Sequence, residues 1–396
     1  MTVLFDLSPV QSTSQSYFHG GGEYAKSLFQ KLLNSKTSRQ LAASYNPDLS
    51  FDPIIQNLID RESVELVVCR QPEDFQNIIR TGKYRRFYSA LPRIQYIENI
   101  DFGATEFMFT LHGLRVLEMP TDRYETRFLS GADRLIAQLK RLRPASYVAR
   151  QKKIFETLIT ASSHRTTIIT VSNHSKYAIL YFFPYLDAEK IKVLHAPPTI
   201  LQMAAETMPD PTVENMIKEK YGIEERGFFL LVSAKVWRKN PYRAIRAIDE
   251  LYSKFSLKLK TLVLGCDDPR IFSVKNKEQF VFAPYASTEE LSAIYRLAYC
   301  LIYPSLNEGY GYPPLESMAF GTPVICSSAT SLPEICGDAV LFFNPYSEYE
   351  LKNRILHLVH EPGAWEYYSK RGKEHQSVVR LKQDEALDEM CKLLMV

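Results

Sequence analysis

Short apolar runs, each about the length of one β-strand, recur along the first half of the chain. Runs of roughly four to eight apolar residues are typical of strands that are buried on both faces of a parallel sheet. The expected strands are Thr2–Leu7, Val64–Cys69, Phe107–Leu111, Thr167–Val171 and Ile191–Leu194. Apolar residues at helical spacing follow the first run, at Tyr24, Leu28, Phe29, Leu32 and Leu33. This half is therefore expected to contain both strands and helices.

The second half shows the same alternation more regularly. Helical patterns at Tyr242–Phe255 and Thr288–Ala298 separate the apolar runs. The expected strands are Phe228–Val232, Leu259–Leu264, Gln279–Phe282, Leu301–Tyr303, Pro323–Cys326 and Val340–Phe343. Because strands that alternate with helices form parallel sheets, both halves are expected to be α/β domains.

The length of 396 residues exceeds what one compact core usually organises, so two domains are expected. Pro197 and Pro198 mark the connection between them. The expected division is an N-terminal domain at 1–197, a C-terminal domain at 198–375, and a C-terminal helix at 376–396 that packs back toward the N-terminal domain. Ligands of open α/β sheets bind beyond the carboxyl ends of the strands. The chemistry is therefore expected in a cleft where the two domains face each other.

The composition is that of an ordinary folded protein. Hydrophobic residues make up 45% and charged residues 23%, and a net charge of +3 does not indicate a nucleic-acid partner. The six cysteines lack C-x-x-C spacing, which favours a reducing compartment and argues against a zinc site. No signal peptide is evident, and no apolar run is long enough to span a bilayer. A cytoplasmic protein is expected.

The stretch from Asn307 to Gly321 has the clearest chemical pattern. Two glycines flank Tyr310 after an expected strand, so the backbone there can turn tightly and come close to a ligand. Pro314 suits the first turn of a helix, and Gly321 suits the position just past its end. Glu316 then falls in the first turn. A Gly-rich loop before a helix start is an anion site that fits a diphosphate.

Two carboxylates, on Glu308 and Glu316, could accept hydrogen bonds from sugar hydroxyls at this site. A purely structural helix start with an acidic first turn explains the same residues equally well.

The same stretch closely resembles the E-x7-E signature of the large retaining glycosyltransferase family 4. It reads Glu308 to Glu316, followed by Ser317-Met318-Ala319-Phe320-Gly321-Thr322-Pro323-Val324-Ile325. The match continues through Thr330–Glu334 and Gly337–Ala339. Family members have the GT-B fold, in which two Rossmann-like parallel-sheet domains face each other across a cleft. The resemblance implies that fold here.

The resemblance also implies roles in binding the donor. Glu308 would contact the hydroxyls of the donor sugar, and Glu316 would contact the ribose. The nucleotide base would lie near Pro284 and Tyr285. The main-chain N–H groups that would face the sugar and the diphosphate are those of Gly309, Tyr310, Gly311 and Tyr312.

A basic loop, Lys235 to Lys239, follows the expected strand Phe228–Val232. Cations at a strand's carboxyl end could neutralise a diphosphate leaving group, although most such clusters are simply solvated turns. The family places an Arg here with a Lys five residues later. Lys239 fits the second position, but Ala234 occupies the first and Lys235 lies one place off. Lys239 and Lys235 are therefore the candidates, ahead of Arg238, and the partner of Lys239 at the diphosphate is left open.

The N-terminal half offers weaker candidates. Gly20, Gly21 and Gly22 form an expected turn before a helix, which could be a flexible surface turn or could resemble the family's glycine loop over the donor phosphates. His112 ends an expected strand and resembles the family's histidine facing the reaction centre, so it joins Glu308 and Lys239 as a catalytic candidate. His174 is interpreted as structural.

Basic residues run from Arg134 to Lys153 without an acidic residue between them. Leu135, Ile136, Leu139 and Leu142 lie at helical spacing among these charges. Such a helix can lie on anionic lipid, or it can pack its apolar face on the protein core. Peripheral contact with the cytoplasmic face of a membrane would suit a lipid-linked acceptor.

Together, these features predict a hexosyltransferase that moves a sugar from a nucleotide diphosphate sugar to a glycan or lipid-linked acceptor, in the biosynthesis of cell-surface polysaccharide or glycoconjugate. The family resemblance implies retention of configuration. No nucleophile motif is evident, which favours a front-face route, and no D-x-D motif indicates a metal. No cofactor is expected.

Three alternatives remain. A sugar-nucleotide epimerase or hydrolase of the same fold, or a non-catalytic nucleotide-sugar-binding protein, would share the donor site. An NAD-dependent oxidoreductase is the weakest of these, because G-x-G-x-x-G is missing.

Overall fold

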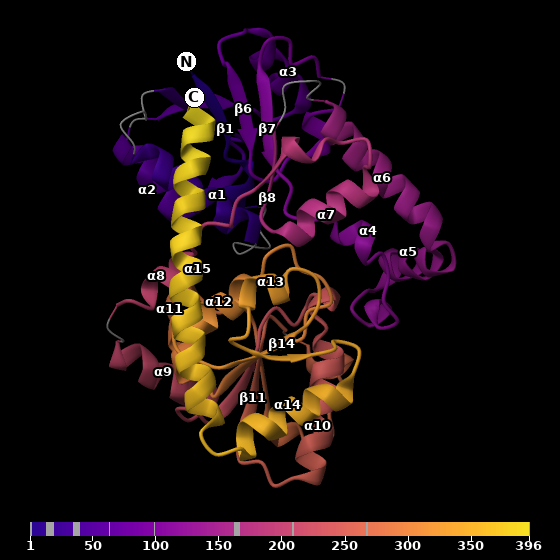
Figure 1. Ribbon diagram of the computed structural model, residues 1–396, viewed down its shortest axis with the longest axis vertical. Coiled ribbons are helices and arrows are strands. Elements are labelled where there is room, and N and C mark those ends of the chain that lie inside the picture. Colours follow the sequence, from indigo (N-terminus) through magenta and orange to yellow (C-terminus); the bar gives the residue numbers. More distant parts are fainter. Residues whose placement is uncertain are drawn as a thin grey trace. The chain divides into compact units, whose positions relative to one another are not determined.

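The computed structural model describes residues 2–12, 20–34, 40–62, 64–98, 100–161, 167–207, 210–266 and 268–395. The chain divides into two compact units, each an α/β domain built on a parallel sheet (Figure 1). Unit 1 comprises Met1–Leu117, Val148–Thr199 and Leu381–Val396, and unit 2 comprises Glu118–Tyr147 and Ile200–Arg380. Within the described ranges, no helix combines the length and the apolar character needed to cross a membrane.

The described part of unit 1 contains a seven-stranded sheet whose neighbouring strands all run parallel. Its order is β5 (Glu65–Val68), β3 (Leu41–Tyr45), β1 (Val3–Asp6), β6 (Arg86–Ser89), β7 (Glu106–Thr110), β8 (Ile168–Thr170) and β9 (Ile191–Val193). A short antiparallel pair joins β2 (Gln11–Ser12) to β4 (Ser50–Phe51). The helices in this part of the chain are α1 (Gly20–Leu33), α2 (Pro53–Glu62), α3 (Pro72–Arg80), α4 (Arg115–Glu118), α6 (Pro144–Thr160) and α7 (Asn173–Phe182).

Unit 2 contains a six-stranded parallel sheet in its described residues. The order is β12 (Phe280–Ala283), β11 (Lys260–Leu264), β10 (Phe228–Leu231), β13 (Cys300–Tyr303), β14 (Val324–Ser327) and β15 (Leu341–Phe343). Its helices include α5 (Gly131–Leu142), α8 (Ile200–Ala204), α9 (Pro211–Tyr221), α10 (Pro241–Lys254), α11 (Thr288–Leu297), α12 (Tyr312–Ala319), α13 (Leu332–Cys336) and α14 (Glu348–His360). The long α15 (Ala364–Met395) follows them.

The eleven expected strands are all present, with bounds shifted by at most one residue. The short β2 and β4 were not expected, and two further strands of the seven-stranded sheet, β3 and β6, lack the apolar runs that predict strands. The β3 strand has small residues at its three central positions and β6 begins with Arg86, yet both are largely buried between parallel neighbours. Burial in the sheet, rather than the intrinsic preference of the residues, decides their conformation.

Arg86 is tolerated inside the sheet of unit 1 because its guanidinium is fully engaged. It lies opposite Glu106 in the parallel register, and its Nε donates to the Glu106 carboxylate at 2.9 Å. Its Nη1 donates to the carbonyls of Leu393 and, at 2.7 Å, Leu394. A buried charge that is paired and hydrogen-bonded in this way avoids most of the desolvation penalty. The end of α15 is thereby held against unit 1.

The structure differs from the expected division at residues 118–147, which group with unit 2 rather than with the N-terminal domain. A buried ion pair holds this segment there, since Arg243 of α10 donates to both Asp122 carboxylate oxygens at 2.8 and 3.2 Å. The ring of Tyr124 packs on that of Tyr242 with centroids 4.3 Å apart. These side-chain contacts join residues far apart in sequence, so no local pattern reveals them. The chain passes from unit 1 to unit 2 between Thr199 and Ile200, next to the connection expected at Pro197 and Pro198.

The C-terminal helix begins earlier than expected, because α15 runs without a break from Ala364 rather than from residue 376. Its last part, from Leu381, belongs to unit 1. Gln383 donates to the Ala196 carbonyl at 2.8 Å, and Asp388 pairs with Lys31 at 2.7 Å. The same helix therefore contributes residues to both units.

We expect Arg243→Ala to destabilise unit 2 by about 3–5 kcal/mol, because it leaves the Asp122 carboxylate buried without its partner. Both tryptophans of the chain, Trp237 and Trp365, belong to unit 2, so tryptophan fluorescence during urea unfolding reports on this unit. Arg270→Ala is the matched control, since Arg270 pairs with Asp268 on the surface. An equal unfolding midpoint in the two variants would show that the Asp122 pair does not anchor the segment.

Candidate active site

The candidate site of unit 2 lies where β10 and β13, neighbours in the sheet, reach their carboxyl ends. The loop Pro304–Gly311 follows β13 and leads into α12. Gly311 is the N-cap of α12, with φ at 123°, and a Cβ at this position would lie 2.7 Å from Leu332 Cδ2. Only glycine fits both the backbone conformation and the space. The expected tight loop before a helix is therefore present.

Thr330 and Ser331 hold the backbone of this loop in place. Ser331 Oγ donates to the carbonyls of Glu308 and Tyr310, at 3.1 and 2.9 Å. The Glu308 N–H donates to Thr330 Oγ1 at 2.9 Å. These hydrogen bonds hold the loop against the segment between β14 and α13.

The Glu308 carboxylate is the centre of the site, and the residue is only 6% exposed. Its Oε1 accepts hydrogen bonds from Tyr303 Oη, Ser305 Oγ and Lys239 Nζ, each at 2.6 Å. Lys239 Nζ also donates to Tyr303 Oη at 2.7 Å. Burial, followed by the negative charge of Glu308, raises the pKa of Tyr303 well above its ordinary value, so this phenol stays a hydrogen-bond donor.

The loop after β10 delivers Lys239 to this carboxylate. Residues Trp237–Lys239 form a 3-10 turn, and Asn240 follows in a left-handed conformation with φ at 59°. The Asn240 side chain donates to the carbonyls of Pro304 and Pro345, at 3.1 and 2.8 Å. The Leu306 N–H donates to the Arg238 carbonyl at 2.8 Å. The two loops are therefore joined on either side of the Lys239–Glu308 pair.

Pro314 lies in the first turn of α12, as expected, but the helix begins at Tyr312, so Glu316 lies in the second turn and not in the first. Its buried carboxylate accepts a hydrogen bond from Tyr295 Oη of α11 at 3.1 Å. Gly321 lies past the helix end, as expected, and Ser369 of α15 donates to its carbonyl at 2.6 Å.

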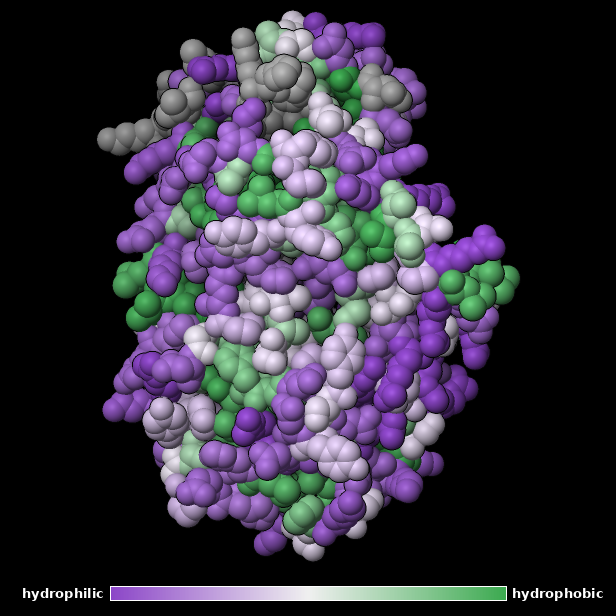
Figure 2. Space-filling model, turned by 45° about the vertical axis from the view of Figure 1, so that its right-hand side comes forward, coloured by the Kyte–Doolittle hydropathy of each residue, from purple (hydrophilic) through white to green (hydrophobic). Residues whose placement is uncertain are grey.

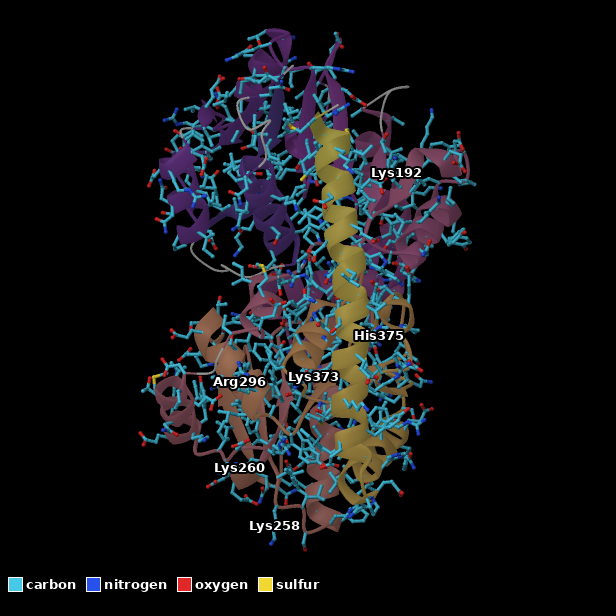
Figure 3. All side chains as sticks on the ribbon, turned by 60° about the vertical axis from the view of Figure 1, so that its left-hand side comes forward. Lys192, Lys258, Lys260, Arg296, Lys373 and His375 are labelled. Atoms are coloured by element: carbon cyan, nitrogen blue, oxygen red, sulfur yellow. The ribbon has the colours of Figure 1, made fainter. Side chains whose placement is uncertain are left out.

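Residues of α15 pack on the chain at the ends of α12 and α13. Lys373 packs on Gly321, and His375 packs on Gly337 and interacts through Nε2 with the Ile335 carbonyl at 2.8 Å (Figure 3). The long helix thus packs on the chain that follows α12 and α13.

Tyr285 lies beside a second glycine at the carboxyl end of the sheet. Gly265 follows β11 with φ at 76°, and a Cβ there would lie 2.8 Å from Tyr285 Cε1. The ring is half-exposed, directly after β12 and Pro284. This is the region in which the sequence predicts a nucleotide base. Lys235 is exposed in the turn before the 3-10 helix, and Arg238 lies over the Trp237 ring.

The remaining candidates belong to unit 1. Gly21 and Gly22 are part of the first turn of α1, so they do not form the expected turn before the helix. His112 follows β7, and its ring contacts the Ala90 carbonyl through Nε2 at 2.8 Å and the Tyr24 ring edge-on at 5.0 Å. Roles of these residues toward a ligand stay predictions. His174 lies in the first turn of α7.

The hydroxyl groups that hold the carboxylates are not apparent from the sequence motifs. Tyr303, Ser305 and Tyr295 donate to Glu308 or Glu316, and none of them is part of a spacing motif. One signal was available, since Tyr303 is a polar group at the last position of a buried strand that leads into the loop. A buried hydroxyl needs a partner, and the nearest carboxylate in sequence is that of Glu308.

Three comparisons bear on this arrangement. Residues 213–375 match the model of the family described as glycosyl transferases group 1. The O-antigen chain mannosyltransferase RfbU of Salmonella typhimurium is 28% identical over 228 residues, which cover 56% of this chain and 58% of that protein. The chain thus spans less than two thirds of the length of this curated relative.

Two solved structures cover almost the whole chain. The Anabaena protein Alr3699/HepE, in complex with UDP, has a TM-score of 0.69 at 13% identity and covers 100% of this chain and 99% of its own. WaaG, a glycosyltransferase involved in lipopolysaccharide biosynthesis, has a TM-score of 0.68 at 14% identity and covers 98% of both chains. At such identities the likeness establishes the fold alone.

Two Rossmann-like units, each with a parallel sheet, define a protein of the GT-B fold class, as expected from the sequence. Residues 213–375, which contain the Lys239–Glu308 pair, match the family of glycosyl transferases group 1.

We expect Gly311→Ala to destabilise unit 2 by about 1–3 kcal/mol more than Gly363→Ala does, because only the first variant combines a positive φ with a steric clash. Gly363 also has a positive φ, of 78°, but nothing lies within 4 Å of an added Cβ. Urea unfolding followed by tryptophan fluorescence measures both variants. Equal destabilisation would mean that the Leu332 contact does not constrain the loop.

Proposed function

We propose that the protein is a retaining hexosyltransferase that uses a nucleotide diphosphate sugar and a glycan or lipid-linked acceptor in cell-surface polysaccharide assembly. The observation that carries this proposal is the buried Lys239–Glu308 pair beside the start of α12, inside the segment that matches glycosyl transferases group 1. The name of RfbU as an O-antigen chain mannosyltransferase and the UDP complex of Alr3699/HepE support the substrate class.

The donor would occupy the carboxyl end of the unit 2 sheet. An ammonium has three N–H donors, and Lys239 directs hydrogen bonds to Glu308 and Tyr303, which leaves one for a diphosphate oxygen. The N-terminus of α12 adds a positive dipole end. Glu308 would accept hydrogen bonds from sugar hydroxyls and Glu316 from the ribose, while Tyr285 would lie beside the base.

The proposed reaction is a front-face substitution. The bond from the anomeric carbon to the diphosphate oxygen breaks, and the acceptor oxygen bonds to that carbon on the same face. The acceptor proton passes to the departing diphosphate oxygen, so charge and atoms balance. Lys239 would stabilise the negative charge that develops on the leaving group, without a metal or cofactor.

We expect donor binding to be visible before any acceptor is known. UDP, GDP and ADP, and their hexose conjugates, would be screened for a rise in melting temperature, because a ligand that binds the folded state stabilises it.

With the best donor, Glu308→Gln and Lys239→Ala should each lower turnover at least 100-fold, the effect typical of losing one group that stabilises the transition state.

Glu278→Gln and Lys277→Ala are the matched controls, since both residues lie in an exposed 3-10 turn of unit 2 and should leave turnover unchanged. Turnover of Glu308→Gln and Lys239→Ala within threefold of the wild type would refute the assigned roles. Free sugar or an epimerised donor formed without acceptor would instead indicate a hydrolase or an epimerase.

We further propose a location on the cytoplasmic face of a membrane, with α5 as the contact. The helix exposes large apolar side chains by 56–77%, namely Leu135, Ile136, Leu139 and Leu142. Ala137, its buried residue, points the opposite way on the helical wheel. The apolar face is therefore turned away from the protein, contrary to the alternative in which it packs on the core.

The charges around this face suit anionic lipid. Arg134, Arg141 and Arg143 are exposed beside the apolar positions, whereas Lys140 is turned inward and pairs with the buried Glu125 at 2.5 Å. In Figure 2 a green patch bordered by purple lies at the right edge, at the height of α5 in Figure 1. Apolar insertion combined with basic flanks is the pattern of an interfacial helix. The buried free thiols of Cys300 and Cys326 suit the reducing cytoplasm.

We expect the double variant Leu139→Glu/Leu142→Glu to reduce sedimentation with vesicles of equimolar phosphatidylglycerol and phosphatidylcholine at least 100-fold in partition coefficient. Each buried leucine contributes about 1.5–3 kcal/mol, and the added carboxylates repel the anionic surface. Leu381→Glu, on an exposed position of α15, is the control. Undiminished sedimentation of the double variant would rule out α5 as the contact.

A further inference from the structure

Backbone strain singles out one short segment of unit 2, between β14 and α13. Across the described residues, the non-glycine positions with positive φ all belong to unit 2, namely Arg226, Ser233, Asn240, Ser273 and Thr330. Thr330 is the β-branched member of this group, and its φ is 52°. A β-branched side chain is poorly tolerated in this conformation. Such strain persists only where the surrounding structure enforces it, and it often accompanies function.

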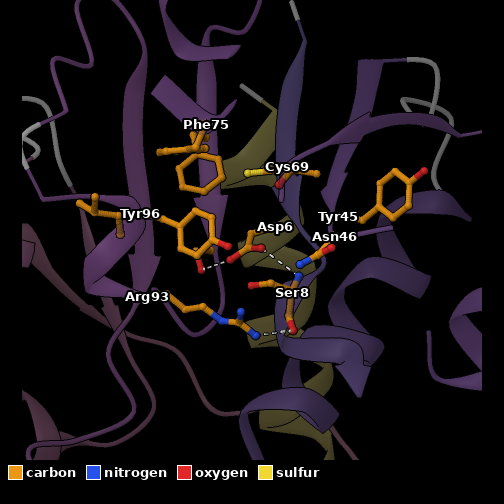
Figure 4. Close-up of a pocket in the computed structure, with 12 residues that line it drawn as sticks. Asp6, Ser8, Tyr45, Asn46, Cys69, Phe75, Arg93 and Tyr96 are labelled. Carbon is orange, nitrogen blue, oxygen red and sulfur yellow. Dashed lines mark hydrogen bonds between the residues drawn. The ribbon is translucent and has the colours of Figure 1, made fainter. Parts of the chain in front are cut away.

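The turn after β1 in unit 1 is closed without strain of this kind. Asp6 Oδ1 accepts a hydrogen bond from the Ser8 N–H at 2.9 Å, and Asp6 Oδ2 accepts one from Ser89 Oγ at 2.7 Å (Figure 4). Leu7, between Asp6 and Ser8, has an ordinary φ of −90°. A polar side chain at a strand end can therefore bond its neighbours with a relaxed backbone, so the strain at Thr330 needs a separate explanation.

The hydrogen bond of the Thr330 side chain supplies that explanation. Thr330 Oγ1 accepts from the Glu308 N–H at 2.9 Å, and the two residues lie 22 positions apart in sequence. The bond joins the segment after β14 to the loop after β13. It fixes the peptide group that precedes the central carboxylate of the site. The strained backbone of Thr330 therefore serves the loop that carries Glu308.

Ser331 departs from its local preference in favour of the same loop. Serine is common at helix N-caps because its hydroxyl accepts from an N–H of the first turn. Ser331 is the N-cap of α13, yet its side chain makes no such capping bond. Its fully buried Oγ donates instead to the carbonyls of Glu308 and Tyr310, at 3.1 and 2.9 Å. Local rules that are broken together in this way are expected at functional sites.

The two carbonyl bonds set the direction of the N–H groups in the loop. In a trans peptide, the C=O of one residue and the N–H of the next point in opposite directions, and the peptides of this loop are trans. Because the carbonyls of Glu308 and Tyr310 point toward Ser331, the N–H groups of Gly309 and Gly311 point away from it. Two N–H groups on one side of a loop, beside the N-terminus of α12, suit an anionic oxygen.

We propose that Thr330 and Ser331 are positioning residues that aim the N–H groups of Gly309 and Gly311 at the β-phosphate of the nucleotide diphosphate donor. Neither side chain touches the ligand in this proposal. It rests on the proposed function, because it assigns how the loop binds the phosphate that leaves with the nucleotide. If Thr330 and Ser331 only held the two segments together, their loss would change stability without a specific effect on the β-phosphate.

The test is isothermal titration calorimetry on the full chain with UDP and GDP, and with UMP and GMP, which lack the β-phosphate. Thr330→Gly and Ser331→Ala should each weaken binding of the diphosphate at least tenfold, because hydrogen bonds to a charged group are lost. Glycine adopts the φ of Thr330 without strain, so Thr330→Gly removes the hydroxyl and keeps the fold. Binding of the monophosphate should stay within threefold of the wild type. Thr330→Ser retains a hydroxyl and should restore diphosphate binding to within threefold.

Ser273→Gly and Ser347→Ala are the matched controls. Ser273 also has a φ of 52°, but it is exposed between the 3-10 turns Pro269–Ile271 and Lys277–Gln279. Ser347 is the N-cap of α14, and its hydroxyl does accept from the Glu350 N–H, at 3.2 Å. Neither control should change diphosphate binding, whereas Ser347→Ala should lower the urea midpoint of unit 2 because a working cap is lost.

The outcomes separate this proposal from the proposed function. Diphosphate binding within threefold of the wild type in Thr330→Gly or in Ser331→Ala overturns the role of that residue. Equal weakening of diphosphate and monophosphate also overturns it, because the loss would then reflect a general disturbance of unit 2. A wild type that binds neither UDP nor GDP contradicts the donor site itself, and the proposed function fails with it.

Discussion

One buried carboxylate oxygen, Oε1 of Glu308, governs the organisation of unit 2. It receives hydrogen bonds from an ammonium, a phenol and a hydroxyl, each at 2.6 Å. Without them, the desolvation of a charge at this depth would cost several kcal/mol. The order of the sheet makes this possible, because β10 and β13 are neighbours and their following loops deliver Lys239 and Glu308 to the same point. The left-handed turn at Asn240 and the glycine at position 311 shape the two loops that meet there.

The sequence predicts the loop and the helix around Glu308 because their signals are local. The spacing from Glu308 to Glu316, the glycine before α12 and the regular alternation of strands all lie within short windows. Each is a property of neighbouring residues, so periodicity and turn chemistry suffice. The family resemblance then adds the GT-B fold, which the sheets of both units confirm.

The features that the sequence does not predict depend on contacts between distant residues. The β3 strand, made of small residues, is a strand only because parallel neighbours bury it, and β6 accommodates Arg86 only because Glu106 lies opposite in register. Residues 118–147 join unit 2 through the Arg243–Asp122 pair, whose partners lie 121 residues apart in sequence. Gly21 and Gly22 show that a run of glycines does not by itself predict a turn, because glycines can also begin a helix. Contacts between distant residues, not local preference, decide these cases.

Charge balance bears on a question that the sequence leaves open, namely which basic residue binds the diphosphate together with Lys239. Lys239 and Glu308 neutralise each other, so their pair alone supplies no net positive charge to an incoming diphosphate. The α12 dipole supplies only about half an elementary charge. A further cation would favour a diphosphate there, and the basic loop that carries Lys239 offers Lys235 and Arg238. Arg238 already lies over the Trp237 ring at 4.4 Å, and its carbonyl is held by Leu306, whereas the Lys235 side chain is exposed. We therefore infer that Lys235, which can move toward a ligand without breaking these contacts, completes the site.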